Sequence, residues 1–407
     1  MMQPLYTNEK GDLLAAKGYE ALAARGSELL PAAGYIPLPK GATFTAMPGR
    51  APLMRTKDGN IVAGKGTAVA VLLPQGFSRM LLPATKTTGG PEVLPLLGYT
   101  AAAMEDGKVY VAAKQTDEHK IWHPDHYNTA DLPERIAKVK KLLPENRIIA
   151  QLTHCSLTYG CFTAQNIFYR RWEGGLPVSK TCNARCIGCI SEQAAECCPS
   201  AQGRISFSPT VKEIAEVGAF HLNGEKKENI ISFGQGCEGE PSLAAEKIVK
   251  AMKVIRDNTD QGTINMNTNA GHTECLQKIV DGGIDTLRVS LFSAVPDHYK
   301  AYYRPKNYAL EDVEGGVAYA VDQGVYVSLN LLAFPGFSDR DEEIEALCGF
   351  IFRTGLQKVQ IRNLNIDADY FYRACGFIPS KSQGMEALIA AIHACGADVG
   401  NYSRPRR

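Results

Sequence analysis

The chain has 407 residues, of which 45% are hydrophobic, and 44 basic side chains balance 43 acidic ones to give a formal net charge of +1. This length suits two structural units, or one large unit with a smaller one appended, and the hydrophobic content allows a large core. The near-zero net charge argues against a surface built to bind a polyanion, so nucleic acid is unsupported as a partner.

The cysteine content and the lengths of the apolar runs together indicate the cellular compartment. Twelve cysteines are too few and too unevenly spaced for a secreted disulfide scaffold, and they fit a reducing cytosol. No run approaches the roughly 18 apolar residues that a membrane span needs, and the N-terminal residues lack a signal-peptide pattern. We therefore expect a cytoplasmic protein that does not interact with membranes.

Residues 1–125 predict a small, mostly-β domain. Within it, Leu13–Leu30 predict one helix, and Gly and Pro recur through Tyr35–Pro52. Short alternating segments bounded by turn residues follow, at Asn60–Ala63, Thr67–Leu73 and Val109–Ala113. Residues 126–175 predict a bridging segment with a helix over Leu132–Leu143.

Three cysteines stand close together in the segment Pro177–Ile190, PVSKTCNARCIGCI. Cys182, Cys186 and Cys189 are separated by three and then two residues. A thiolate at neutral pH needs a depressed pKa or a metal, so three crowded thiols indicate ligands rather than packing. A [4Fe–4S] cluster held by three cysteines leaves its fourth iron open to bind another molecule. We favour this interpretation over a zinc site, which usually pairs two ligand sets, and over a redox CxxC, which would leave Cys182 unused.

Strand-like and helix-like segments alternate six times in residues 176–407. The predicted pairs are Leu176–Ser179 with Ser208–Phe220, Asn229–Phe233 with Ser242–Asp257, Thr263–Asn267 with His272–Asp281, Thr286–Phe292 with Leu310–Asp322, Tyr326–Ala333 with Asp341–Thr354, and Lys358–Leu364 with Met385–Ala394. Strands rich in Val, Ile and Leu between amphipathic helices are typical of a parallel sheet. Six units are too few for a closed eight-stranded barrel, so we predict an α/β fold with an open, partial (βα)6 barrel. Ligands of such sheets bind at the carboxyl ends of the strands.

The CxxxCxxC spacing resembles the signature of the radical S-adenosylmethionine (radical SAM) superfamily, which uses this partial barrel. The resemblance implies that Cys182, Cys186 and Cys189 are the catalytic and metal-binding residues, holding a [4Fe–4S] cluster whose open iron binds S-adenosylmethionine (SAM). It further implies that an electron from the cluster cleaves SAM to methionine and a 5′-deoxyadenosyl radical. A reducing partner such as flavodoxin or ferredoxin would supply the electron. Members often carry an aromatic residue before the third cysteine, where this chain has Gly188.

The predicted SAM-binding residues follow the second to fifth strands. In Gly234–Leu243, GQGCEGEPSL, the residues Gly239-Glu240-Pro241 resemble the GEP core of the family motif that holds the SAM ammonium group. Glu238 replaces a glycine of that motif, which leaves open which acid makes the contact. The turn Asn267–Ala270 resembles the TNG turn of the family, and its short amides can bond ribose or carboxylate oxygens. The complete predicted set is Gly236, Glu238, Gly239, Glu240, Pro241, Asn267, Asn269, Ser290 and Asn330.

Two further groups of residues have more than one interpretation. The polar segment Arg362–Asp367 closes the sixth strand, and we expect it to face the substrate. Four cysteines could ligate a second cluster or be ordinary buried thiols, since free cysteine is often buried. They are Cys155, Cys161, Cys197 and Cys198.

The sequence thus predicts a radical SAM enzyme that abstracts hydrogen from an unidentified substrate. The barrel layout resembles the peptide-modifying branches most, so a peptide or protein, bound with the help of the N-terminal domain, is the substrate we consider first. Two alternatives stay open. One is a non-catalytic iron–sulfur electron carrier or sensor, which a fourth thiolate ligand would favour. The other is a radical SAM RNA methyltransferase with Cys375 or Cys395 as methyl carrier.

Overall fold

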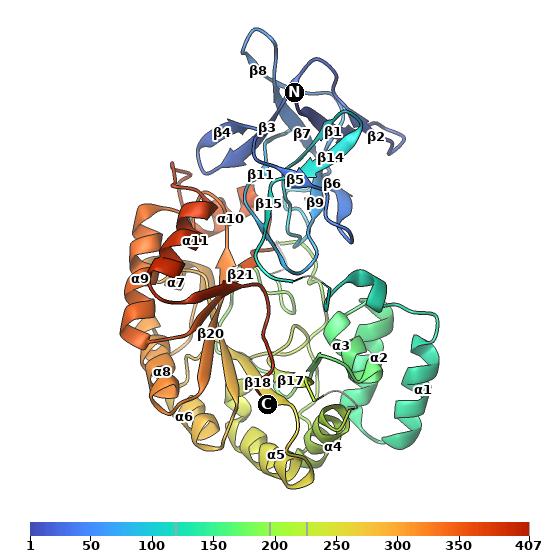
Figure 1. The fold of residues 1–407 in the computed structure, drawn as a ribbon, viewed down its shortest axis with the longest axis vertical. Coiled ribbons are helices and arrows are strands. Elements are labelled where there is room, and N and C mark those ends of the chain that lie inside the picture. The colour runs from blue at the N-terminus through green and yellow to red at the C-terminus, as the bar shows by residue number, and fades with distance from the viewer. Residues whose placement is uncertain (119, 195–196, 225–226, 407) are drawn as a thin grey trace.

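A computed structural model describes residues 1–118, 120–194, 197–224 and 227–406. An antiparallel β region at the N-terminus sits on one end of a parallel α/β barrel, and three helices connect the two (Figure 1). The predicted fold class, a partial barrel with an N-terminal mostly-β region, is confirmed. Within the described residues, no helix combines the length and apolar character needed to cross a membrane.

The N-terminal region consists of short strands in three antiparallel sheets. One sheet has the order β5-β14-β13-β1-β9-β6 with β2 paired to β1, another has the order β11-β3-β7-β12 with β4 and β8 at its sides, and β10 pairs with β15. The strands are β1 (Gln3–Thr7), β2 (Leu13–Ala15), β3 (Glu20–Arg25), β4 (Glu28–Pro31), β5 (Ile36–Pro37), β6 (Thr43–Ala46), β7 (Arg50–Arg55), β8 (Ile61–Ala63), β9 (Thr67–Leu72), β10 (Phe77–Arg79), β11 (Leu82–Pro83), β12 (Thr85–Thr87), β13 (Ala102–Glu105), β14 (Lys108–Val111) and β15 (Ala113–Gln115).

The predicted helix over Leu13–Leu30 is wrong, because strands β2, β3 and β4 occupy this segment. Gly18 and Gly26 adopt φ angles of 84° and 58°, which turn the chain between the strands. β3 and β4 then pair across the second turn, with Ala24 opposite Leu29. Short apolar runs do not distinguish a helix from paired strands when the pairing partners lie elsewhere in the chain.

The bridging segment holds one short 3₁₀ helix and three α-helices. They are η1 (Pro124–His126), α1 (Leu132–Leu142), α2 (Arg147–Thr158) and α3 (Phe162–Tyr169). The α-helices lie beside the first strands of the barrel (Figure 1). The helix predicted over Leu132–Leu143 is confirmed as α1.

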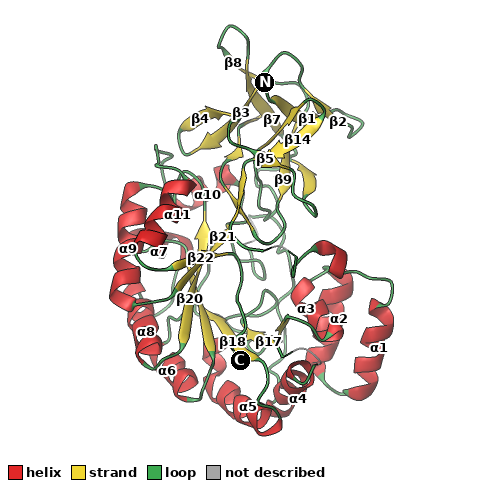
Figure 2. Ribbon diagram, viewed as in Figure 1, coloured by secondary structure: helices red, strands yellow, loops and turns green. Residues whose placement is uncertain are grey.

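The barrel is a parallel sheet of seven strands in sequential order with its helices on the outer side (Figure 2). Its strands are β16 (Glu173–Gly175), β17 (Ile230–Phe233), β18 (Thr263–Thr268), β19 (Thr286–Leu291), β20 (Tyr326–Ala333), β21 (Lys358–Asn363) and β22 (Asp398–Gly400). Its helices are α4 (Val211–Leu222), η2 (Pro241–Ala244), α5 (Ala245–Asn258), α6 (Thr273–Asp281), α7 (Pro296–Tyr303), α8 (Leu310–Asp322), α9 (Asp341–Thr354), α10 (Ala368–Cys375) and α11 (Met385–Ala394).

Two strands of the barrel differ from the prediction. The first strand is Glu173–Gly175 rather than Leu176–Ser179, because the backbone N–H groups of Val178 and Ser179 donate to the Glu238 carboxylate instead of a neighbouring strand. A seventh strand, β22, follows the six predicted ones; with three residues it is too short to show a periodic pattern.

The inner side of the barrel is polar, while the hydrophobic core lies between the sheet and its helices. On β19, the alternate residues Leu287, Val289 and Leu291 belong to this core. Arg288 points the other way, donating to Asn267 Oδ1 at 2.6 Å and to Glu173 Oε1 at 2.8 Å. Successive strand residues face opposite sides, so Ser290 faces the barrel interior with Arg288.

The N-terminal region covers the carboxyl ends of the strands. The Asn363 side chain accepts from the backbone N–H of Arg79 at 2.7 Å, and the Arg79 guanidinium donates to the Leu364 carbonyl at 3.0 Å. Arg50 and Asp367 form an ion pair of 3.0 Å in which both side chains are almost fully buried. The expectation that Arg362–Asp367 face the substrate is therefore corrected for Asn363 and Asp367, whose side chains bind the N-terminal region.

Candidate functional site

The three predicted cluster ligands face one cavity at the carboxyl end of the barrel. Cys182, Cys186 and Cys189 are half-buried and line a cavity of about 360 Å³, which we call the cysteine cavity. Three arginines and one glutamate also line it, namely Arg185, Arg204, Arg304 and Glu192. Thiolate ligands bring negative charge, which the cationic groups would offset. The donor set and the surrounding charge therefore fit an iron–sulfur cluster.

Helix α7 holds the cysteine loop, residues Cys182–Cys189, by backbone hydrogen bonds. The carbonyls of Tyr303 and Tyr302 accept from Arg185 N at 3.0 Å and Ile187 N at 3.1 Å. A Cβ atom at Gly188 would lie 2.6 Å from the Tyr302 hydroxyl oxygen, so a larger residue does not fit there without a shift of this ring. The sequence did not predict α7, an eight-residue helix without a clear apolar face.

Burial and mutual repulsion disfavour the thiolate forms of two of these cysteines when no metal is bound. Burial, followed by the nearby Glu240 carboxylate, raises the pKa of Cys182 to about 11. Burial also raises the pKa of Cys186 well above its usual value, with the other two thiols adding to the shift. A bound metal would reverse this preference, because coordination stabilises the thiolate.

The turn after β17 pairs with the segment that leads into the cysteine loop. The Gly239 and Glu240 N–H groups each donate at 2.8 Å, to the carbonyls of Ser179 and Thr181 respectively. A Cβ atom at Gly239 would lie only 2.0 Å from the Thr181 carbonyl oxygen, so this approach requires glycine. Gly236 is also tightly packed, because a Cβ atom added there would lie 2.4 Å from Ile190 Cδ1.

Glu238 is a buried acid that joins two loops. Its carboxylate accepts three backbone N–H bonds, from Val178 at 2.7 Å, Ser179 at 2.9 Å and Gly234 at 2.6 Å. Burial raises the pKa of Glu238 to about 8, and the three donors oppose that shift. All of these donors belong to the loops that flank the cysteine loop, so this carboxylate orients them.

Glu240 joins the turns after β17 and β18. Its carboxylate accepts from Ser242 N at 3.0 Å and from the Thr268 hydroxyl. It also accepts from Asn269 N at 2.8 Å, and burial raises the pKa of Glu240. The Asn269 amide in turn donates to Asn183 Oδ1 at 2.6 Å, which links the turn after β18 to the cysteine loop.

The other predicted SAM-binding residues lie next to these turns or inside the barrel. Pro241 is buried and begins η2. Asn267 accepts from Arg288 and donates to the Gly234 carbonyl at 3.2 Å. Ser290 and Asn330 are register partners on β19 and β20, and both are half-buried. The predicted residues thus gather around one end of the barrel, from which the cysteine loop also rises.

Arg204 is a site residue that the sequence did not indicate. Its guanidinium donates to Cys189 Sγ at 3.7 Å and to the Ser191 hydroxyl at 3.2 Å, and it pairs with Glu192 at 2.5 Å. It lies 15 positions after Cys189 and belongs to no spacing motif. Only the return of the chain past the cysteine loop brings it to the thiol.

Each of the four cysteines considered for a second cluster contacts at least one nearby side chain. The Cys155 thiol hydrogen-bonds that of Cys237, which lowers the pKa of Cys155 and raises that of Cys237. Cys161 Sγ lies 3.2 Å from the Thr163 hydroxyl, and the Cys197 and Cys198 sulfurs lie 3.7 Å apart. These contacts do not bring the four cysteines to one site, and a second cluster stays a prediction.

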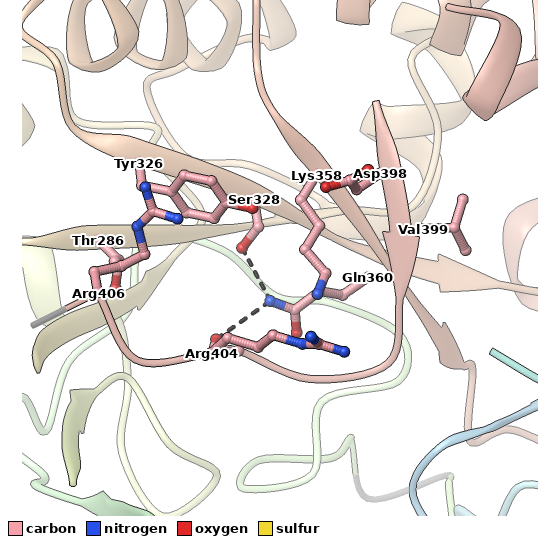
Figure 3. Close-up of a pocket in the computed structure, with 10 residues that line it drawn as sticks. Thr286, Tyr326, Ser328, Lys358, Gln360, Asp398, Val399, Arg404 and Arg406 are labelled. Carbon is pink, nitrogen blue, oxygen red and sulfur yellow. Dashed lines mark hydrogen bonds between the residues drawn. The ribbon is translucent and has the colours of Figure 1, made fainter. Parts of the chain in front are cut away.

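A second cavity, of about 320 Å³, lies at the opposite end of the barrel (Figure 3). Thr286, Tyr326, Lys358 and Asp398 line it, and each is the first residue of a strand. Arg404 and Arg406 from the C-terminal segment cover it. No thiol lines this cavity among the described residues. Its chemistry does not suit an iron–sulfur cluster, and we assign the candidate active site to the cysteine cavity.

Comparison with known proteins identifies one family. Residues 176–348 match the profile of the Radical SAM superfamily. No curated protein sequence matches the chain.

Several solved structures resemble the fold. A radical SAM methyltransferase from Sphaerobacter thermophilus is 16% identical with a TM-score of 0.42, over 56% of this chain and 65% of that one. The FeFe-hydrogenase maturase HydG from Carboxydothermus hydrogenoformans is 14% identical with a TM-score of 0.36, over 66% and 73% of the two chains. SuiB from Streptococcus suis, bound to the precursor peptide SuiA, is 12% identical with a TM-score of 0.39, over 65% and 54%. The chain thus covers less than two thirds of the methyltransferase, and these similarities are too low to carry function across.

Proposed function

The chain belongs to the radical SAM superfamily, whose members are enzymes with a [4Fe–4S] cluster and SAM as cofactors, and on this premise we propose which residues hold them and what the enzyme acts on. Cys182, Cys186 and Cys189 ligate the cluster in this proposal. The observation that carries it is the convergence of the three thiols on one cavity at the carboxyl end of the barrel. Bound there, the cluster and SAM supply a radical that abstracts a hydrogen atom from the substrate.

The remaining site residues divide into two groups in this proposal. Glu238 and Glu240, each already accepting three hydrogen bonds, hold the loops at fixed positions around the cysteine loop. The main chain of Gly236 to Pro241 and the side chains of Asn267, Asn269, Ser290 and Asn330 contact SAM. Short amides and hydroxyls can bond its ribose and carboxylate oxygens. The N-terminal region above them excludes water, which protects a reactive intermediate.

We further propose a peptide or protein substrate, supported by strand β12 at the edge of an N-terminal sheet. β12 pairs only with β7 among the described strands and is partly exposed. The Thr87 hydroxyl donates to Asp369 at 3.0 Å, and the next residue on α10, Tyr370, lines the cysteine cavity. An extended peptide that paired with this strand edge would extend toward the cysteine cavity.

The test is anaerobic reconstitution of the wild type and of the Cys182→Ala variant. The wild type is expected to bind iron and sulfide, to absorb at about 400 nm through sulfur-to-iron charge transfer, and to release 5′-deoxyadenosine from SAM when dithionite is added. The variant should lose both properties, because two cysteines cannot hold the cluster firmly. Cys348→Ala, on the outer helix α9, is the matched control and should retain both.

Retention of cluster and SAM cleavage by Cys182→Ala would show that the ligand assignment is wrong. Deuterium transfer from a deuterated peptide mixture into 5′-deoxyadenosine tests the substrate class separately. A cluster that forms in the wild type but cleaves no SAM would instead favour an electron carrier.

A further inference from the structure

A lysine-rich groove lies directly behind the segment that leads into the cysteine loop. Its volume is about 550 Å³, and it is lined by Ser179–Thr181, by the start of α5 and by part of α6. Four lysines line this groove, which we call the lysine groove: Lys180, Lys247, Lys250 and Lys278. Among the described residues, none lines both the cysteine cavity and the lysine groove, so the groove is a separate surface feature.

The groove carries a strong local excess of positive charge. Glu246 is the only acidic lining residue in the described part of the chain, and its carboxylate lies 3.8 Å from the Lys278 ammonium group. Lys180, Lys250 and Lys278 are exposed. The first turn of α5 adds the positive end of a helix dipole. Four lysines against one carboxylate contrast with a net charge of +1 for the whole chain, so this surface favours an acidic partner.

Consecutive residues of the chain line the groove and the cysteine cavity. Thr181 lines the groove, and the next residue, Cys182, lines the cavity. The Ser179 and Thr181 carbonyls that accept from Gly239 and Glu240 fix this segment in place. A protein docked in the groove would therefore lie next to the cluster without occupying the space that SAM and the substrate need.

We propose that the lysine groove is the docking surface of a small, acidic one-electron carrier protein. This inference rests on the proposed function, in which the cluster must receive an electron from outside. One electron passes from the reduced carrier to the oxidised cluster; the carrier is oxidised, the cluster is reduced, and no atom is transferred. An acidic peptide substrate fits the groove less well, since a substrate must reach the cysteine cavity and the groove has other lining residues.

The test uses a purified flavodoxin as the probe and the reconstituted protein. The groove variant combines Lys250→Glu on α5 with Lys278→Glu on α6 and so reverses two exposed charges. The control, called the α1 variant, combines Lys140→Glu with Lys141→Glu on α1, which does not line the groove. Stopped-flow absorbance measures the rate of cluster reduction by reduced flavodoxin. The groove variant should be slower by about tenfold or more at low salt, with a weaker dependence on salt, because charge steering sets such association rates. SAM cleavage driven by dithionite should stay at the wild-type rate in both variants.

Equal rates of reduction by flavodoxin in the groove variant and the α1 variant would overturn the docking site. Failure of the proposed function has a different result, namely that no SAM is cleaved with dithionite by any form of the protein. Titration of flavodoxin against cluster-free protein tests the groove in that case as well. A several-fold weaker dissociation constant for the groove variant alone supports the docking site, and equal constants contradict it.

Discussion

Cys189 differs from the other two cysteines of the loop because a cation contacts its sulfur. The Arg204 guanidinium lies 3.7 Å from Cys189 Sγ, and its side chain is 15% exposed. Hydrogen bonds to ligand sulfurs and nearby charges are among the factors that set the potential of an iron–sulfur cluster. A reduced cluster carries one more negative charge than an oxidised one, so a nearby cation stabilises the reduced form. With a cluster bound at the proposed ligands, Arg204 would therefore raise its reduction potential.

Replacing Arg204 by Met is expected to lower the midpoint potential of the reconstituted cluster. Loss of one charged hydrogen bond of about 1–2 kcal/mol corresponds to roughly 40–90 mV for one electron. Glu192→Gln removes the exposed carboxylate that pairs with Arg204, so this control should shift the potential in the opposite direction. Redox titration followed by electron paramagnetic resonance measures both shifts. An unchanged potential in Arg204→Met would contradict the role of the guanidinium.

At the scale of secondary structure, two buried acids hold together the loops that follow the first three strands. Glu238 joins the loop after β16 to the end of β17, and Glu240 joins the turn after β17 to the turn after β18. Buried carboxylates are stable only when hydrogen bonds satisfy them, and each of these accepts three. The geometry of the cysteine loop thus depends on a close approach of backbones that Gly239 permits.

Gly239→Ala should therefore disturb the site through the backbone. The new methyl group would lie 2.0 Å from the Thr181 carbonyl oxygen, so the two segments must separate. We expect a loss of about 1–3 kcal/mol in the free energy of unfolding, together with less iron bound per chain. Urea unfolding and iron analysis measure the two effects. Gly315→Ala on α8, where nothing lies within 4 Å of the added atom, should instead stabilise the protein by about 0.5–1 kcal/mol.

At the scale of the whole molecule, the N-terminal region sits on the end of the barrel that bears the candidate site. Its contacts include buried charged groups. Arg79 is 1% exposed and bonds the carbonyls of Tyr99 and Leu364, and burial lowers its pKa to about 9. Asp367 pairs with Arg50 and also accepts from Leu94 N at 3.1 Å. These buried charged groups fix the N-terminal region on this end of the barrel.

Removing the buried carboxylate in Asp367→Ala should loosen this interface. Arg50 would be left without its 3.0 Å ion pair, a change that costs about 3–5 kcal/mol for buried pairs. We expect lower stability in urea and faster proteolysis between the N-terminal region and the barrel. Asp369→Ala is the matched control, since Asp369 lies 3.5 Å from Arg50 but is 60% exposed and should contribute less than about 1 kcal/mol. Similar stability in both variants would show that the buried pair does not hold the regions together.

The sequence by itself determined the features that depend on residues close together in the chain. The cysteine spacing lies within a single loop, and the barrel helices and strands repeat a local apolar pattern. Segments α8, β20, α9 and α11 have the predicted bounds. Long elements of this kind can be predicted locally, because their hydrophobic periodicity follows the geometry of the element itself.

Only the tertiary structure decided which distant groups meet. It replaced the predicted helix over Leu13–Leu30 with paired strands, and it occupied both Glu238 and Glu240 with donors from other loops. It also placed Arg204 beside the Cys189 thiol. The lysines of the groove come together from α5, α6 and the segment that leads into the cysteine loop. The partners of a buried or clustered side chain come from segments far apart in the chain, and their meeting depends on how the whole molecule packs rather than on local spacing.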